Sequence, residues 1–342
     1  MTRMVEDPGK LAPLTAAGLL ITDWCSARCR HCYVSAGPEG RRWMPVEAAA
    51  GHLAALARLG VPAAGIHIGG GEPFGDFDRL LQIVRAARAA RQSVGRAGVG
   101  YVETGGFWAA DEGTVRERIG ALAEAGMMQL SISADPYHQE FIPAERVRLL
   151  LAVAREVLGP RGVRVRRWKW LQDARDVAAM SEPERLGLFR SFLRRYAERM
   201  NGRAAEQLAP LVEQGHQEPF PDDCREAIIG SRHVHIDPDG WVCPGTCAGI
   251  AIGRATADRP LDELVRTWRM EDAPLVAALV EGGPRRLADY AAGLLRGGSG
   301  DTPRIEEGCA DKCRLCWSVR KGLALAGVEK KNLQPASSYL TT

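Results

Sequence analysis

The chain has 342 residues, 46% of them hydrophobic. It can bury a large core and exceeds the roughly 100 to 200 residues usual for one domain. Its 45 basic and 42 acidic residues give a net charge of only +3, so charge alone indicates no nucleic-acid or polyanion partner. No apolar run reaches the roughly 18 residues that span a bilayer, and the N-terminus lacks the apolar core of a signal peptide. We therefore expect a cytoplasmic protein, away from membranes, with one large domain and an appended smaller one.

Strand-like and helix-like segments alternate through the first half of the chain. Short apolar runs predict strands at residues 18–22, 65–68, 99–103, 128–133 and 163–168. Helical patterns, which begin near Pro or Asp and mostly end near Gly, lie at 45–60, 76–90, 111–126 and 143–159. Repeated strand–helix units predict an α/β fold with a parallel sheet that is partly closed into a TIM-like (β/α)6 barrel.

The pattern changes after residue 170. A charged helical stretch covers about 182–213, and "RHVHIDPDGWVC" at 232–243 predicts a β-hairpin that turns at "DPDG". A Pro-rich segment near 215–225 predicts a domain boundary. The expected domains are 1–215, with a helical insert at about 171–215, and 216–342, built from the hairpin and helix.

The nine cysteines form two separate groups. Thiols stay reduced in the cytosol, so clustered cysteines there indicate metal ligands more than disulfides. A structural zinc site uses four protein ligands, whereas three cysteines leave one metal position open for chemistry. Two metal sites are therefore predicted, and the first has an open position. The first group is Cys25, Cys29 and Cys32, and the second is Cys224, Cys243, Cys247, Cys309, Cys313 and Cys316.

The first group, "CSARCRHC", follows the first expected strand with the spacing C-x3-C-x2-C. This arrangement resembles the cluster loop of the radical S-adenosylmethionine (SAM) superfamily. The resemblance implies that Cys25, Cys29 and Cys32 hold three irons of a [4Fe-4S] cluster, whose fourth iron binds SAM. It also implies that His31 takes the position of the residue that lies against the adenine.

A second motif, "GGGEP" at 69–73, follows the second expected strand and resembles the superfamily's GGE motif. In that resemblance, Gly70 and Gly71 let the backbone approach SAM closely, and Glu72 helps to bind its methionyl end. On its own, such a glycine run is more often a tight turn. The two motifs together, each at the end of a strand, are far more specific.

Polar residues end the fourth expected strand. In the family, residues at this position reach the ribose and the carboxylate of SAM, which implies such roles for Ser131, Ser133 and Asp135. Their spacing of two would place them on one face of a strand. The alternative is that Asp135 and Pro136 open a turn while the serines fill the barrel, and alternation does not separate the two.

The second cysteine group resembles the twitch module, the shortened SPASM domain. That resemblance implies an auxiliary [4Fe-4S] cluster held by Cys224, Cys243, Cys313 and Cys316. Cys309 could replace Cys224 or Cys243, because it repeats the C-x3-C-x2-C spacing. A zinc site is the alternative, since thiolates bind either centre.

Two thiols are left over in that assignment, Cys247 and Cys309. A thiol near a substrate radical can return a hydrogen atom to it, so both are candidate catalytic residues. A buried spare cysteine is the alternative for Cys247, because unpaired cysteines are often buried.

The resemblance implies an enzyme that cleaves SAM to a 5′-deoxyadenosyl radical and removes a hydrogen atom from a small-molecule metabolite or natural product, by dehydrogenation or epimerisation. It also implies a flavodoxin- or ferredoxin-type electron donor. The alternative is a peptide-modifying enzyme, which the roughly 17 residues before the first strand disfavour because they cannot form a leader-binding domain. A basic segment at 161–170 offers Arg164 or Arg166 for an anion in the barrel, and RNA is disfavoured by the low charge. An iron–sulfur carrier without enzymatic activity would not explain "GGGEP".

Overall fold

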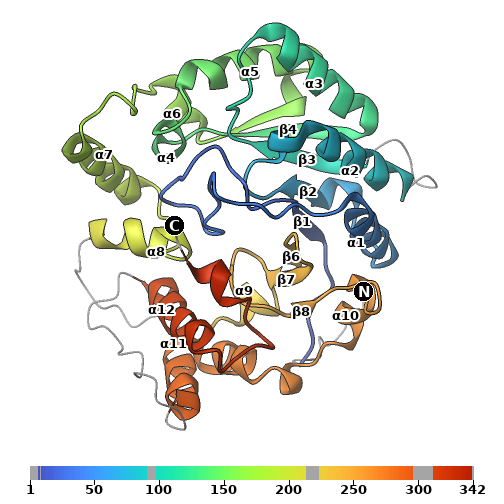
Figure 1. The fold of residues 1–342 in the computed structure, drawn as a ribbon, viewed down its shortest axis with the longest axis vertical. Helices are drawn as coiled ribbons and strands as arrows, with labels where there is room; N and C mark the ends of the chain where they lie inside the picture. Colours follow the sequence, from blue (N-terminus) through green and yellow to red (C-terminus); the bar gives the residue numbers. More distant parts are fainter. Residues whose placement is uncertain (1–6, 8, 91–97, 213–222, 296–310, 341–342) are drawn as a thin grey trace, which may run out of the picture.

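The computed structural model describes residues 7, 9–90, 98–212, 223–295 and 311–340 (Figure 1). Within these residues the strands form one sheet in the order β5-β4-β3-β2-β1-β6-β7-β8. The strands from β5 to β6 in this order are parallel, and β7 and β8 continue the sheet antiparallel. This mostly parallel open sheet confirms the predicted α/β class. The strands are β1 (Ala16–Leu20), β2 (Ile66–Gly69), β3 (Val99–Thr104), β4 (Met127–Ser133), β5 (Val163–Arg166), β6 (His233–Ile236), β7 (Trp241–Pro244) and β8 (Gly253–Arg254).

Four helices connect β1 to β5 and pack side by side over one face of the sheet (Figure 1). Sequence signals set their ends: Asp76 and Asp111 accept hydrogen bonds from the first-turn amides of Arg79 and Thr114, and Gly126 ends α3 with φ 117°. These helices are where the apolar periodicity predicts them. They are α1 (Val46–Arg58), α2 (Phe77–Ala89), α3 (Glu112–Ala125) and α5 (Ala144–Leu158).

The two faces of the parallel strands differ in character. Leu19, Ile68, Val102, Leu130 and Ile132 are buried in the apolar core. The positions between them face the barrel interior and are glycine or polar, so the interior suits a polar ligand more than a packed core. These interior residues include Gly18, His67, Tyr101, Glu103, Ser131 and Arg164.

The predicted hairpin is present and belongs to the main sheet. Strands β6 and β7 are joined by a turn in which Asp237 accepts hydrogen bonds from the amides of Asp239 and Trp241. Because β6 also pairs in parallel with β1, the C-terminal part of the chain extends the barrel sheet. The predicted boundary near 215–225 falls largely on residues 213–222, outside the described residues, and the division into two domains stays a prediction.

The stretch expected to be helical at 182–213 is interrupted. Helix α7 ends at Arg195, and at Gly202 the chain turns with φ 56°. A side chain there would lie 2.3 Å from the carbonyl oxygen of Tyr33, so glycine lets this segment pack against the cysteine loop. The further helices are α4 (Pro136–Gln139), α6 (Trp168–Gln172), α7 (Glu182–Arg195), α8 (Arg203–Gln207), α9 (Arg225–Ile228), α10 (Leu261–Thr267), α11 (Pro274–Leu295) and α12 (Lys312–Ala326).

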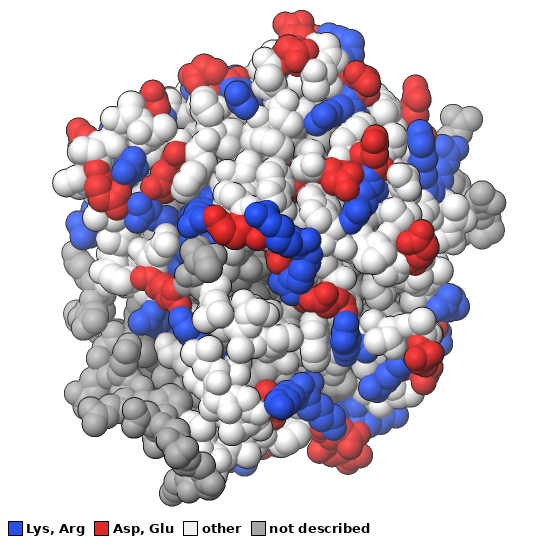
Figure 2. All heavy atoms as spheres, viewed as in Figure 1, with Lys and Arg blue, Asp and Glu red and all other residues white. Residues whose placement is uncertain are grey.

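On the face shown in Figure 2, acidic and basic side chains are interspersed, in keeping with the small net charge. Among the described residues, no helix is both long enough and apolar enough to cross a membrane.

Candidate functional site

Cys25, Cys29 and Cys32 line a cavity of about 360 Å³ at the C-terminal ends of the strands. The glycine motif lines the same cavity, so the structure brings the two sequence motifs together. Burial raises the pKa of Cys25 to about 12 and that of Cys29 well above its usual value. Thiols in such surroundings become thiolates only when positive charge, as from bound metal, compensates them.

The glycine motif holds the chain that leads into the cysteine loop. The amide of Gly71 donates to the carbonyl of Thr22 at 2.7 Å, and the amide of Glu72 donates to that of Trp24 at 2.7 Å. A Cβ atom on Gly71 would lie 1.9 Å from the Trp24 oxygen, so no other residue fits without moving this backbone. Gly70 has φ 136°, a conformation that also favours glycine.

We expect Gly71→Ala to lower iron incorporation and to destabilise the fold by about 1–3 kcal/mol, the usual cost of overpacking. Iron per chain and the midpoint of thermal unfolding would measure the two effects. Gly51→Ala is the matched control, because Gly51 lies on α1 with nothing near its Cβ position. Equal iron content and equal melting in the two variants would contradict the proposed role of this close backbone contact.

Glu72 is buried and ties the ends of two strands together. Its carboxylate accepts hydrogen bonds from the Thr104 hydroxyl at 2.9 Å and from the Gly105 amide at 2.8 Å. Burial raises its pKa to about 7 although these hydrogen bonds oppose the rise. The carboxylate lines the cavity, where its binding of the methionyl end of SAM stays a prediction.

The residues predicted to contact adenine and ribose take different positions. His31 lines the cavity and stacks on Tyr137 with ring centroids 4.9 Å apart, while its buried Nδ1 has no hydrogen-bond partner. Ser133 also lines the cavity. Asp135 instead accepts hydrogen bonds from two amides at the start of α4, and Ser131 accepts one from Arg164. Asp135 also lies 3.7 Å from His31 Nε2, and its predicted role toward SAM stays a prediction.

Further cavity residues come from the segment after α7, which no sequence motif identified. Glu198, Arg199 and Asn201 line the cavity together with Arg166 and Arg167. Glu198 pairs with Arg167 at 3.0 Å. The only sequence signal for any of these residues is the basic segment, because the rest reach the cavity through tertiary packing alone.

Arg203 carries a positive charge into the cysteine loop. Its side chain is 1% exposed and donates to the carbonyls of Cys29, Ser35 and Ala36. No carboxylate among the described residues pairs with it, and its charge lowers the pKa of Cys25 against the effect of burial. A buried charge needs compensation, which thiolates of the loop can supply.

The second cysteine group also has a buried arginine beside its thiols. Burial raises the pKa of Cys224 to about 11 and of Cys313 to about 12, and the thiols of Cys316 and Cys247 add to both shifts. The Nε of Arg320, a side chain 2% exposed, donates to Cys316 Sγ at 3.2 Å. In the described part of the chain no carboxylate pairs with this guanidinium, which otherwise donates to the Ala248 carbonyl and contacts the Tyr339 hydroxyl.

Cys243 and Cys247 lie in different surroundings. Arg199 approaches Cys247 Sγ at 3.9 Å, and burial followed by the Cys316 thiol raises the pKa of Cys247. Cys243, on β7, has Asp237 as its strongest electrostatic neighbour. It lines a second cavity of about 290 Å³, with Tyr33 and His235. Cys309 lies outside the described residues, and the eight described cysteines form no disulfide.

Residues 19–177 match the family model of the Radical SAM superfamily. The match includes the cysteine loop and the glycine motif. This part of the chain is a radical SAM domain. Its cofactors are accordingly a [4Fe-4S] cluster and SAM, and the three thiols beside a buried guanidinium fit an anionic cluster.

Two solved structures resemble this one. BtrN in complex with AdoMet and 2-DOIA aligns over 81% of this chain and 91% of its own, at 13% identity and a TM-score of 0.45. Native anSMEcpe with bound AdoMet and the Cp18Cys peptide aligns over 93% and 98%, at 13% identity and a TM-score of 0.43. The comparison with curated proteins found no significant match.

Proposed function

We propose that this radical SAM enzyme oxidises a small molecule bound in the cavity beside its cysteine loop. When bound, SAM and the reduced cluster supply a 5′-deoxyadenosyl radical that removes a hydrogen atom from an unactivated C–H bond. The observation that carries the proposal is the convergence of Cys25, Cys29, Cys32 and the glycine motif on one cavity. A flavodoxin- or ferredoxin-type protein in the cytoplasm is the proposed reductant.

The chain's own residues would bind and position the reactants. The three cysteines ligate the cluster, the backbone at Gly70 and Gly71 admits SAM, and the unpartnered Nδ1 of His31 is available to the adenine.

The size and lining of the cavity support a small substrate. Its volume of about 360 Å³ has to accommodate SAM as well, which leaves room only for a small substrate. Its wall carries both Glu103 and the two cations Arg166 and Arg167, which suit a polar metabolite. Burial raises the pKa of Glu103, while Arg164 and Arg166 oppose the rise. The peptide-modifying alternative requires an open channel for a chain, and no observation among the described residues favours it.

An auxiliary [4Fe-4S] cluster is the second part of the proposal. Buried Arg320 has no carboxylate partner among the described residues, yet donates to Cys316, so thiolates supply its counter-charge. We assign the ligands as Cys224, Cys247, Cys313 and Cys316, with Cys247 in place of the Cys243 expected from the twitch spacing. Such a centre, when bound, offers an acceptor for the second electron of an oxidation. Zinc at the same thiolates is the alternative.

Turnover in D2O tests the reaction type. Oxidation gives a product lacking two hydrogens and no deuterium at the reacting carbon, because no hydrogen atom returns to it. Anaerobic enzyme, SAM and reductant would be incubated with candidate metabolites, and 5′-deoxyadenosine and products followed by mass spectrometry. An isomeric product that carries solvent deuterium would show epimerisation through a thiol instead and would overturn the oxidation.

A further inference from the structure

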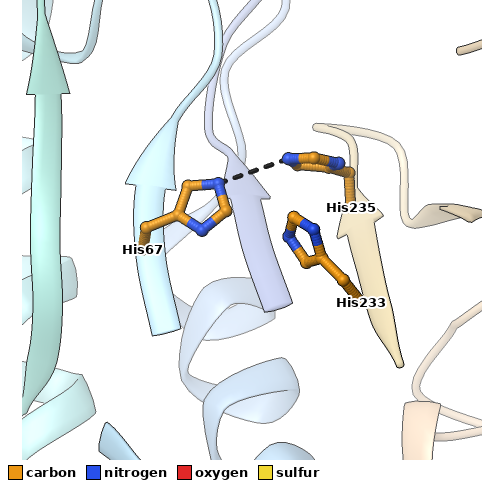
Figure 3. Close-up of side chains that lie close together, drawn as sticks. All are labelled: His67, His233 and His235. Carbon is orange, nitrogen blue, oxygen red and sulfur yellow. Dashed lines mark hydrogen bonds between the residues drawn. The ribbon is translucent and has the colours of Figure 1, made fainter. Parts of the chain in front are cut away.

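Three histidines meet inside the barrel. None of them lines the cavity at the cysteine loop, and His235 lies opposite Cys243 in the sheet. His67 lies on β2, and His233 and His235 lie on β6, with β1 between the two strands (Figure 3). Each offers a ring nitrogen, and these nitrogens all lie within 4.8 Å of one another. Neither the family's cluster nor its SAM site requires these residues.

Glycine at one position creates the space between the rings. Gly18 of β1 is level with both His67 and His235 in the sheet. A Cβ atom there would lie 2.4 Å from His67 Nε2 and 2.4 Å from a ring carbon of His235. Any other residue at Gly18 would therefore push the two imidazoles apart.

The distance between two of the rings fits a shared metal ion. His67 Nε2 and His235 Nε2 are 3.2 Å apart (Figure 3). Two nitrogens bound tetrahedrally to zinc at about 2.0–2.1 Å are separated by about 3.3 Å. The third residue, His233, has a buried Nε2 with no hydrogen-bond partner, which is a lone donor or acceptor left for a ligand.

A hydrogen bond fixes which nitrogen of His235 faces the others. Its Nδ1 lies against the Gly245 carbonyl, which can only accept, so Nδ1 carries the hydrogen. The other ring nitrogen, Nε2, faces His67 and Tyr33 and is left to accept a hydrogen bond or bind a ligand. Metal-binding histidines commonly donate their other nitrogen to a backbone carbonyl in this way.

We propose that His67, His233 and His235 bind a zinc ion inside the barrel, with the fourth coordination position open toward Tyr33. In the metal-free chain, His67 Nε2–H donates to His235 Nε2. The ion takes the place of this hydrogen, which moves to Nδ1 of His67, so all three ligands are neutral imidazoles. The Tyr33 hydroxyl lies 3.4 Å from His235 Nε2, close to the open position.

An open position on such an ion has a chemical consequence. Three neutral ligands leave the charge of zinc uncompensated, which lowers the pKa of a bound water to about 7. Tyr33 lines both the cavity at the cysteine loop and the second cavity. The ion would thus hold hydroxide, or an oxygen atom of a ligand, near Tyr33, which lines both cavities.

Zinc content and zinc X-ray absorption of the cluster-loaded enzyme test the site. After incubation with zinc sulfate and desalting, we expect about one zinc per chain with only nitrogen and oxygen neighbours at about 2.0–2.1 Å. Zinc at cysteines would instead show sulfur at about 2.3 Å. His233→Ala and His235→Ala should each reduce the zinc to below about a tenth per chain, as loss of one of three ligands predicts.

His52→Ala is the matched control, because His52 is buried on α1 outside the cluster. Gly18→Ala should lose zinc while every ligand is retained. Iron content and circular dichroism equal to those of the parent enzyme would show that the variants are folded. Absence of zinc, sulfur neighbours, or equal zinc in the control and in correctly folded His233→Ala would each overturn the proposal.

Discussion

Replacing Cys25, Cys29 and Cys32 together with Ala is expected to lower the iron content from about eight to about four per chain and to abolish SAM cleavage. Burial raises the pKa of Cys25 and Cys29, so these thiols become thiolates when a metal compensates them, and no other described cysteine lines the cavity. Loss of the ligands therefore removes the only centre in that cavity able to reduce SAM. Iron analysis and 5′-deoxyadenosine measured by chromatography after anaerobic reduction would give both values.

The control for this variant is Cys224→Ala combined with Cys313→Ala. It should also lose about four irons, yet it should still form 5′-deoxyadenosine because the loop at the SAM cavity is intact. Circular dichroism would establish that both proteins are folded. Formation of 5′-deoxyadenosine by the triple variant would refute the assignment of the three cysteines to the cluster that cleaves SAM.

Local sequence patterns were sufficient for the strands and helices of the barrel. Each expected strand differs from the observed one by at most two residues at an end, because apolar runs and capping residues act locally. In "GIHIG" and "RHVHI" histidines alternate with apolar residues, and this alternation also predicts the polar inner face of the sheet. His67, His233 and His235 could have been expected inside the barrel on that pattern.

The order of the strands required the structure. Strand β6 comes after β5 in the chain but pairs with β1, at the other end of the parallel sheet. Strand pairing between distant segments depends on long-range packing, which a local pattern does not encode. For the same reason, no motif indicated Arg203, which reaches the cysteine loop from α8. Arg320 follows Cys316 by four residues on the same helix, α12, so its contact with that thiol is local and could have been expected from the sequence.

Cysteine spacing proved an incomplete guide to cysteine environment. The twitch spacing favours Cys243, which follows the hairpin turn directly. In the structure its side chain lies on β7 beside Asp237, and the next turn carries Cys247 to Arg199 and the Cys316 thiol. Strand β7 ends at Pro244, and in the turn that follows the Cys247 amide donates to the Pro244 carbonyl, so the geometry of this turn and not the cysteine spacing sets the position of the Cys247 thiol.

Single substitutions of the two thiols are expected to give opposite results. Cys247→Ala should lose about four irons and all product but keep SAM cleavage, because it removes an auxiliary ligand and leaves the first cluster intact. Cys243→Ala should keep about eight irons, since Cys243 lines the second cavity and is not among the four proposed ligands. Cys243 is buried and Cys247 is half-buried, and each variant is the control for the other because both remove one thiol of the same group. Iron content, 5′-deoxyadenosine and product, all measured on the same samples, would decide between the two ligand sets.

Full iron content in Cys247→Ala with loss of iron in Cys243→Ala would restore the ligand set expected from spacing. It would also leave Cys247 as a thiol able to donate a hydrogen atom, which is the condition for epimerisation.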